Sequence, residues 1–168
     1  MEFLQSLQSL FAQPRRLLAL ISAAGAALLA FGLYLQHAIG LEPCPMCIVQ
    51  RYVFMLVIVV AGVGAALRPP AAARWTGAVL LVLGLAGAFV AARQSWLQWF
   101  PPEVYSCGRD LYGMIESFPL KRVIPMVFRG SGDCSAVDWT FLGLSIANWS
   151  FLTFALIAAL GVGLLRRR

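Results

Sequence analysis

The sequence predicts an all-α membrane protein, a single domain in which four transmembrane helices form a bundle. Composition is the first observation, because 61% of the 168 residues are hydrophobic and 12% are charged, whereas soluble domains average about 45–50% and about 25%. The second is a set of four long stretches without acidic side chains, and the third is a net charge of +6 that falls on one side of them. A soluble domain of this length could not bury so much apolar surface. Disordered chains, nucleic-acid-binding proteins and water-soluble enzymes are therefore disfavoured.

Each stretch is long enough to cross the hydrocarbon core as a helix, which takes about 20 apolar residues. The predicted spans are residues 17–35, 46–67, 75–92 and 147–165. The first is long, lacks a clear small-residue cleavage site and precedes three others, so we interpret it as a helix rather than a signal peptide. The second contains one charged residue, Arg51, and is followed by Pro69 and Pro70, which stop a helix. The third ends before Arg93, and glycine and alanine within the spans favour close helix packing.

The distribution of arginine predicts that both termini are cytoplasmic. One side holds the N-terminus, the 68–74 turn and the C-terminus, and its charged residues are Arg15, Arg16, Arg68, Arg74, Arg166, Arg167, Arg168 and Glu2. Acids and bases balance on the other side, which carries connections near residues 36–45 and 93–146. Because basic residues near span ends stay in the cytoplasm, these two loops are expected outside. We interpret the terminal arginines as an anchor of this topology, with lipid or nucleic-acid recognition as the alternative.

The cysteines all fall in the two outer loops or at their edge, two in each: Cys44, Cys47, Cys107 and Cys134. The outer side of a membrane is where disulfides persist, in the bacterial periplasm or the secretory lumen. Four cysteines permit three connectivities. Loop membership favours a Cys44–Cys47 bond and a Cys107–Cys134 bond at rest.

The motif Cys44-Pro45-Met46-Cys47 favours reversible redox chemistry, because a bridge across so short a loop gains little chain entropy. Cys47 is expected at the start of the second helix, where unpaired N–H groups and the helix dipole favour a thiolate. Arg51 follows four residues later on the same helical face and is a candidate functional residue. Its alternative role is to extend to the membrane interface. Ile48 stands where a c-type haem motif needs histidine, and a zinc site lacks a second close pair.

The second cysteine pair encloses an apolar segment, 111–128, which is expected to lie on the membrane surface. A disulfide in such a loop can exchange with an outside thiolate through a mixed disulfide. Two pairs on one face suggest a relay from a soluble dithiol protein to a lipid-soluble acceptor. No haem, iron–sulfur or flavin motif is present in the sequence, so a quinone fits best. Two inert structural disulfides in a membrane scaffold remain the alternative.

A set of motifs then resembles the DsbB family of bacterial inner-membrane disulfide bond formation proteins. The motifs are Gln36-His37, Pro43-Cys44-Pro45-Met46-Cys47, Arg51, Leu97-Gln98, Pro101, Ser131-Gly132-Asp133-Cys134, Trp139 and Phe141-Leu142-Gly143-Leu144. The resemblance covers nearly the whole chain. It implies a multi-pass inner-membrane thiol:quinone oxidoreductase that reoxidises a DsbA-like periplasmic protein of thioredoxin fold. It leaves open whether the quinone is ubiquinone or menaquinone, and whether the chain is a paralogue with a dedicated partner.

The resemblance also implies a role for each cysteine. The partner's cysteine attacks Cys107, which forms a mixed disulfide and releases Cys134. A Cys44–Cys134 bond between the loops is a further intermediate. Cys47 is then the thiolate that engages the quinone. Arg51 matches the family's arginine near the quinone and would stabilise that thiolate or the reduced quinone.

One position departs from the family, whose members can carry a histidine beside the quinone. Gln94 stands in its place here. Glutamine can donate a hydrogen bond to a quinone oxygen, but it cannot carry a proton near neutral pH. The chain's only histidine is His37, near the end of the first span. It is a candidate quinone-side residue, with an interfacial side chain of no catalytic role as the alternative.

Overall fold

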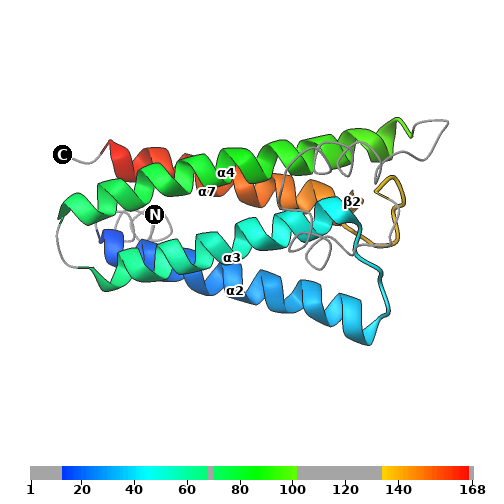
Figure 1. Ribbon diagram of the computed structural model, residues 1–168, viewed down its shortest axis with the longest axis horizontal. Helices are drawn as coiled ribbons and strands as arrows, with labels where there is room; N and C mark the ends of the chain where they lie inside the picture. The colour runs from blue at the N-terminus through cyan, green and yellow to red at the C-terminus, as the bar shows by residue number, and fades with distance from the viewer. Residues whose placement is uncertain (1–12, 68–69, 102–133, 167–168) are drawn as a thin grey trace, which may run out of the picture.

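Four long helices and one short hairpin make up the part of the protein that the structure describes (Figure 1). The computed structural model describes residues 13–67, 70–101 and 134–166. The helices are α2 (Pro14–Ala38), α3 (Pro45–Ala66), α4 (Pro70–Trp99) and α7 (Ile146–Leu165), and the strands are β1 (Thr140–Phe141) and β2 (Leu144–Ser145). All four helices are long and apolar enough to cross a membrane. The predicted class, an all-α four-helix membrane protein, is confirmed.

The helices begin where the sequence supplies start signals. Proline occupies the first turn of α2 and of α3, where its missing N–H removes no hydrogen bond. The helix α7 begins differently, because the Ser145 hydroxyl accepts a hydrogen bond from the backbone N–H of Asn148 at 3.4 Å. Ser145 is also the last residue of a tight antiparallel hairpin, in which it pairs with Thr140. The hairpin was not predicted as a strand pair.

The third predicted span, residues 75–92, is shorter at both ends than the helix that contains it, α4, which begins at Pro70. The helix α4 continues to Trp99 rather than ending near residue 92. Arg93 suggested the end of the apolar run, but its side chain is exposed, so the charge does not interrupt the helix. The extra turns bring Gln94 and Gln98 into the bundle instead of leaving them in a loop.

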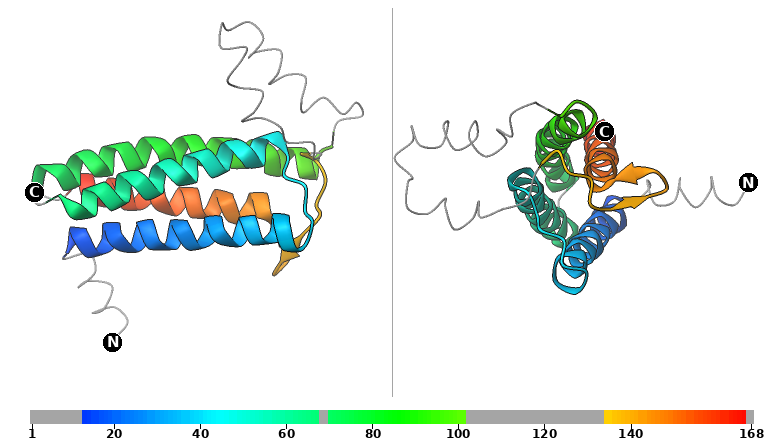
Figure 2. Two further views of the ribbon diagram at one scale, coloured as in Figure 1. Left: turned by 60° about the horizontal axis from the view of Figure 1, so that its bottom comes forward. Right: turned by 90° about the vertical axis from the view of Figure 1, so that its right-hand side faces the viewer.

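Neighbouring helices in the sequence are neighbours in space: α2 packs on α3, α3 on α4, and α4 on α7. The view along the bundle in Figure 2 shows these four helices as the corners of the molecule. The helices α2 and α7 make few direct contacts. The core is centred on Leu18, Val57, Leu80 and Phe154, one from each helix and each 0% exposed.

The contact between α4 and α7 is built on glycine. A Cβ atom at Gly84 would lie 2.7 Å from the backbone nitrogen of Ala158 and 2.9 Å from the carbonyl oxygen of Phe154. A Cβ atom at Gly161 would lie 2.8 Å from the carbonyl oxygen of Gly77. The two backbones therefore touch, which is how helices associate in lipid without a hydrophobic driving force between them.

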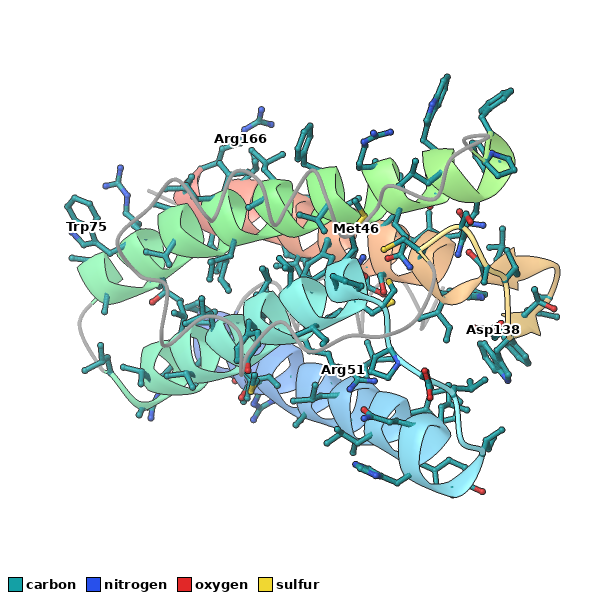
Figure 3. The ribbon with its side chains drawn as sticks, turned by 45° about the vertical axis from the view of Figure 1, so that its right-hand side comes forward. Met46, Arg51, Trp75, Asp138 and Arg166 are labelled. Carbon is teal, nitrogen blue, oxygen red and sulfur yellow. The ribbon has the colours of Figure 1, made fainter. Side chains whose placement is uncertain are left out.

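The two ends of the bundle differ in their charged side chains. One end collects the start of α2, the end of α3, the start of α4 and the end of α7 (Figure 1). There Arg15 donates from Nε to the carbonyl oxygen of Ala65 at 3.0 Å. Figure 3 shows Trp75 and Arg166 towards this end and Asp138 towards the other. The described arginines of the predicted cytoplasmic side thus share one end, and the described cysteines lie at the opposite end.

Candidate active site

The first turn of α3 holds the Cys44-Pro45-Met46-Cys47 motif. Cys44 is the N-cap residue, with extended backbone (φ −76, ψ 163), and Pro45 opens the helix. The Cys44 Sγ accepts a hydrogen bond from the backbone N–H of Cys47 at 3.3 Å. This capping turns both thiols to one side, where their sulfurs are hydrogen-bonded at 2.9 Å. Cys47 therefore lies in the first helical turn, as its position in the motif predicted, beside the positive end of the helix dipole.

Cys134, from the predicted outer loop near residues 93–146, lies against this pair. Its side chain is 0% exposed and packs with Cys44, Met46 and Leu97 in one buried cluster. Hydrogen bonding with Cys134, then with Cys47, together with burial, raises the pKa of the Cys44 thiol above its ordinary value. Cys44 thus lies between two thiols and stays protonated. Cys107, the fourth predicted redox cysteine, lies outside the described residues, as does the apolar segment 111–128.

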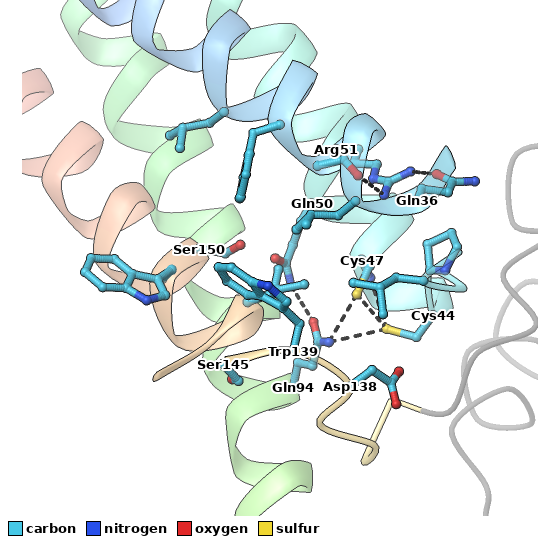
Figure 4. Close-up of a pocket in the computed structure, with 18 of the residues that line it drawn as sticks. Gln36, Cys44, Cys47, Gln50, Arg51, Gln94, Asp138, Trp139, Ser145 and Ser150 are labelled. Carbon is cyan, nitrogen blue, oxygen red and sulfur yellow. Dashed lines mark hydrogen bonds between the residues drawn. The ribbon is translucent and has the colours of Figure 1, made fainter. Parts of the chain in front are cut away.

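A chain of two buried amides reaches the sulfurs from α4 and α3 (Figure 4). Gln94 donates from Nε2 to Cys47 Sγ at 3.2 Å and to Cys44 Sγ at 3.4 Å. Its Oε1 accepts from Gln50 Nε2 at 2.7 Å. Both glutamines are 4% exposed. Gln94 was a sequence candidate. Gln50 was missed, although a glutamine inside an apolar span was an available signal.

Arg51 faces the same region from the next turn of α3. Its Nη1 donates to Gln36 Oε1, and its Nη2 donates to the carbonyl oxygen of Gly32 at 3.4 Å. Both partners lie on α2, so the guanidinium is held between two helices rather than extended along the lipid surface. His37 follows Gln36 in the sequence, but its side chain is exposed and does not line the cavity described next. The structure brings together every described site candidate except His37.

A cavity of about 370 Å³ adjoins these groups. Its apolar wall comes from α2, α3, α7 and the hairpin region, and includes Leu28, Phe31, Leu35, Phe54, Trp139 and Trp149. Its polar lining includes Cys44, Cys47, Gln50, Arg51 and Gln94. A mostly apolar cavity with a few convergent polar groups is the usual form of a site for a small organic ligand.

Aromatic rings span the side of the cavity where α2 and α7 are not in close contact. Phe31 of α2 meets Trp139 edge to face at 5.8 Å between ring centroids. Trp139 stacks with Phe141 at 6.1 Å, and Phe141 lies 6.1 Å from Trp149 of α7. The indole N–H of Trp149 donates to the carbonyl oxygen of Phe141 at 3.0 Å. The hairpin thereby covers the open side of the bundle.

Gln98 ties the segment after Cys134 to α4. Its Nε2 donates to the carbonyl oxygen of Ala136 at 3.4 Å, and its Oε1 accepts from the Ser145 hydroxyl at 2.6 Å. Both ends of segment 136–145 are therefore fastened to one side chain. Because Cys134 lies two residues before this segment, Gln98 helps to fix its thiol against Cys44.

Comparison with known proteins identifies relatives that match almost the whole chain. The family model described as Disulfide bond formation protein DsbB matches residues 14–164. A protein named Disulfide bond formation protein B from a Polaromonas species is 66% identical over 156 residues, which cover 93% of each chain. Its namesake from Aromatoleum aromaticum is 51% identical over 164 residues, which cover 96% of this chain and 98% of that protein.

Proposed function

The chain belongs to the DsbB family of disulfide bond formation proteins, and we propose that it passes electrons from a periplasmic protein dithiol to a membrane quinone. The family makes it a multi-pass membrane protein with a thiol oxidoreductase role. One observation carries the finer proposal. Cys44 contacts both Cys47 and Cys134 beside a cavity whose walls are mostly apolar.

The proposed reaction begins at the Cys107–Cys134 disulfide. A thiolate of a reduced DsbA-like partner attacks Cys107 Sγ, which forms a mixed disulfide and releases Cys134 as a thiolate. The partner's second thiolate then displaces Cys107 and closes the partner's own disulfide. Two electrons have moved from the partner to this pair, and the partner's two protons go to the released sulfurs or to water.

The contact between Cys134 and Cys44 supports the next exchange. The Cys134 thiolate attacks Cys44 Sγ of the Cys44–Cys47 disulfide, so a Cys44–Cys134 bond forms and Cys47 leaves as a thiolate. The Cys107 thiolate then attacks Cys134 Sγ, restores the Cys107–Cys134 bond and releases Cys44. The raised pKa of Cys44 favours its protonation on release. The two electrons now reside on Cys44 and Cys47.

The cavity fits a quinone in its size, its apolar wall and the position of its polar groups. The proposed quinone-binding residues are Cys47, Arg51 and Gln94. When bound, ubiquinone or menaquinone would accept the two electrons and two protons that the dithiol gives up. Arg51, held by α2, would stabilise negative charge on Cys47 or on a ligand oxygen. Gln94 supplies a neutral donor, and His37 has no place in the proposal because it lies outside the cavity.

The proposed orientation places the cysteine end at the periplasmic face of the bacterial inner membrane. Arg15, Arg16, Arg74 and Arg166 lie near the opposite ends of their helices, which the positive-inside rule assigns to the cytoplasm. Two alternatives remain: a paralogue with a dedicated partner, and a membrane scaffold with inert disulfides. The cluster of Cys44, Cys47 and Cys134 argues against the scaffold, because its disulfides would have no need to meet.

The test is turnover with purified components. Detergent-solubilised protein is mixed with a reduced thioredoxin-fold dithiol protein and ubiquinone, and quinone absorbance is followed over time. The proposal expects catalytic loss of oxidised quinone that disappears in Cys47→Ser. Absence of turnover with several partners and quinones, while the cysteines stay oxidised, would favour the scaffold.

A further inference from the structure

Gln50 lies one hydrogen bond behind the reacting pair, because its described hydrogen bond goes to Gln94, which itself donates to the sulfurs. It is 4% exposed, and its Nε2 donates to Gln94 Oε1 at 2.7 Å. Gln94 is equally buried and turns its own Nε2 to Cys47 and Cys44. The order of donors therefore runs from α3 to α4 and back to the cysteines on α3 (Figure 4).

The direction of this chain matters because an amide has a donor end and an acceptor end. Gln50 occupies the oxygen of Gln94 with a donor, which leaves only the NH₂ group of Gln94 for the sulfurs. A thiolate accepts hydrogen bonds and cannot donate them. Were the Gln94 amide reversed, its oxygen would face the sulfurs and favour protonated thiols. The orientation of one buried amide thus selects the protonation state of the pair.

We propose that Gln50 is a positioning residue, which fixes the Gln94 amide with its NH₂ group on Cys47 so that the Cys47 thiolate is stabilised by an uncharged donor. This inference rests on the proposed function only in that Cys47 acts as a thiolate. The proton of the Cys47 thiol goes to water.

Neither amide titrates, so their support for the thiolate should not vary with pH. The ionisable or charged side chains around them are the cavity-lining Glu42, Cys44, Arg51 and Asp138, together with Cys134 behind Cys44. Gln50 donates its hydrogen bond to Gln94, and the guanidinium of Arg51 is bound to α2. A titrating side chain at position 50 would therefore make the orientation of the Gln94 amide depend on pH, which it does not in the native chain.

The experiment measures the rate at which iodoacetamide alkylates Cys47 in the fully reduced protein, in detergent, with neither partner nor quinone. Peptide mass spectrometry resolves Cys47 from the other cysteines. At pH 7, Gln50→Leu should slow the reaction about tenfold, because its loss frees the Gln94 amide to reverse. Gln94→Leu should slow it at least as much, and the double variant should be no slower than Gln94→Leu alone. Ser95→Ala is the matched control, a buried polar side chain on α4 without a hydrogen-bond partner in the described structure, and should leave the rate unchanged.

Gln50→Glu gives a second, independent test if the leucine variant fails to fold. A protonated glutamic acid donates to Gln94 as glutamine does, whereas an ionised one accepts from the Gln94 NH₂ group and turns it from the sulfurs. The alkylation rate of Cys47 in Gln50→Glu should match the native rate at low pH and fall below it as pH rises. Equal rates for Gln50→Glu, Gln50→Leu and the native protein at every pH would overturn the inference. Native turnover of quinone alongside these equal rates would leave the proposed function standing, while the expected rates without turnover would overturn that function alone.

Discussion

The two sides of α7 are packed in different ways. On one side, α7 meets α4 so closely that Gly84 has no room for a Cβ atom beside Ala158. On the other, α7 and α2 make few contacts, and aromatic rings and a cavity occupy the space between them. Small side chains close the first interface, and large side chains hold the second one open.

The closely packed side of α7 supports the fold, whereas the side with the cavity carries the reactive groups. The α4–α7 interface supplies a frame because backbone touches backbone where Gly77 meets Gly161 and where Gly84 meets Ala158. The cavity on the α2–α7 side is lined by Cys44, Cys47, both buried glutamines and Arg51, which come from α3 and α4. A change in the closed interface should therefore alter the whole fold, whereas a change on the open side should alter reactivity. Four sets of variants probe the two sides, in order of decreasing expected effect.

Gly84→Leu should break the closed interface. The added Cβ would lie 2.7 Å and 2.9 Å from backbone atoms of α7, which cannot move aside as a flexible side chain could. Overpacking costs about 1–3 kcal/mol of unfolding free energy even where side chains can adjust. We therefore expect the unfolding free energy to fall by at least about 3 kcal/mol. The measurement is thermal or SDS-induced unfolding in detergent. Gly163→Leu in α7 is the control, because nothing lies within 4 Å of its added Cβ. Equal unfolding of the two variants would contradict the account.

Arg51→Ala should lower quinone turnover at the cavity without unfolding the protein. It removes the two hydrogen bonds to Gln36 and Gly32 and the positive charge at the cavity. A charged hydrogen bond contributes about 1.5–3 kcal/mol, so quinone turnover should fall about 10- to 100-fold. Disulfide exchange with the partner should change little, and Arg51→Lys should restore part of the loss. Equal loss of turnover and partner exchange would assign Arg51 a structural role.

Gln98→Ala should loosen the hairpin side while the closed interface stays intact. The variant loses the hydrogen bonds to Ala136 and Ser145. Two such bonds contribute about 1–2 kcal/mol, so the Cys44–Cys134 disulfide should form about tenfold less readily. Its equilibrium with glutathione can be measured in protein that carries Cys47→Ser and Cys107→Ser. Trp99→Ala, an exposed neighbour, should leave the equilibrium unchanged. No difference between the two variants would refute this role for Gln98.

The smallest effect is expected at the hairpin turn. Leu142 and Gly143 both have positive φ, 52° and 78°, the pattern of two-residue turns that favour Asn-Gly. The Leu142 side chain is 78% exposed, so it gains little from packing. Leu142→Asn should stabilise the protein by about 0.5–1 kcal/mol, and Gly143→Ala should destabilise it by about 1 kcal/mol. The unfolding midpoints of the two variants test these predictions. A loss of stability in Leu142→Asn would count against strain at this turn.

The sequence predicted the parts of the fold that depend on hydrophobic runs and helical spacing. Four charge-poor stretches became four helices, and the spacing of Cys47 and Arg51 placed both at one cavity. The end of α4 was misjudged because a single arginine can remain exposed without ending a helix. Consequently, Gln94 was expected in a loop rather than on a helix inside the bundle.

Other features depend on contacts that no local pattern encodes. Cys134 reaches Cys44 across a long connection, and only the family resemblance suggested that these two could bond. Gln50 adjoins Arg51 in the sequence, but its hydrogen bond crosses to α4 and depends on where that helix ends. The positive φ of Leu142 is equally unforeseeable, because leucine rarely adopts it.

We propose that Cys44 and Cys47 give their electrons directly to a quinone in the adjoining cavity. The most direct measurement mixes fully reduced protein, freed of reductant and oxygen, with a short-chain ubiquinone and no partner. We expect one quinone to be reduced for every two thiols lost, with the first losses at Cys44 and Cys47 and no loss in Cys47→Ser. Loss of thiols elsewhere first, or no reduction of quinone by the reduced protein, would contradict this proposal.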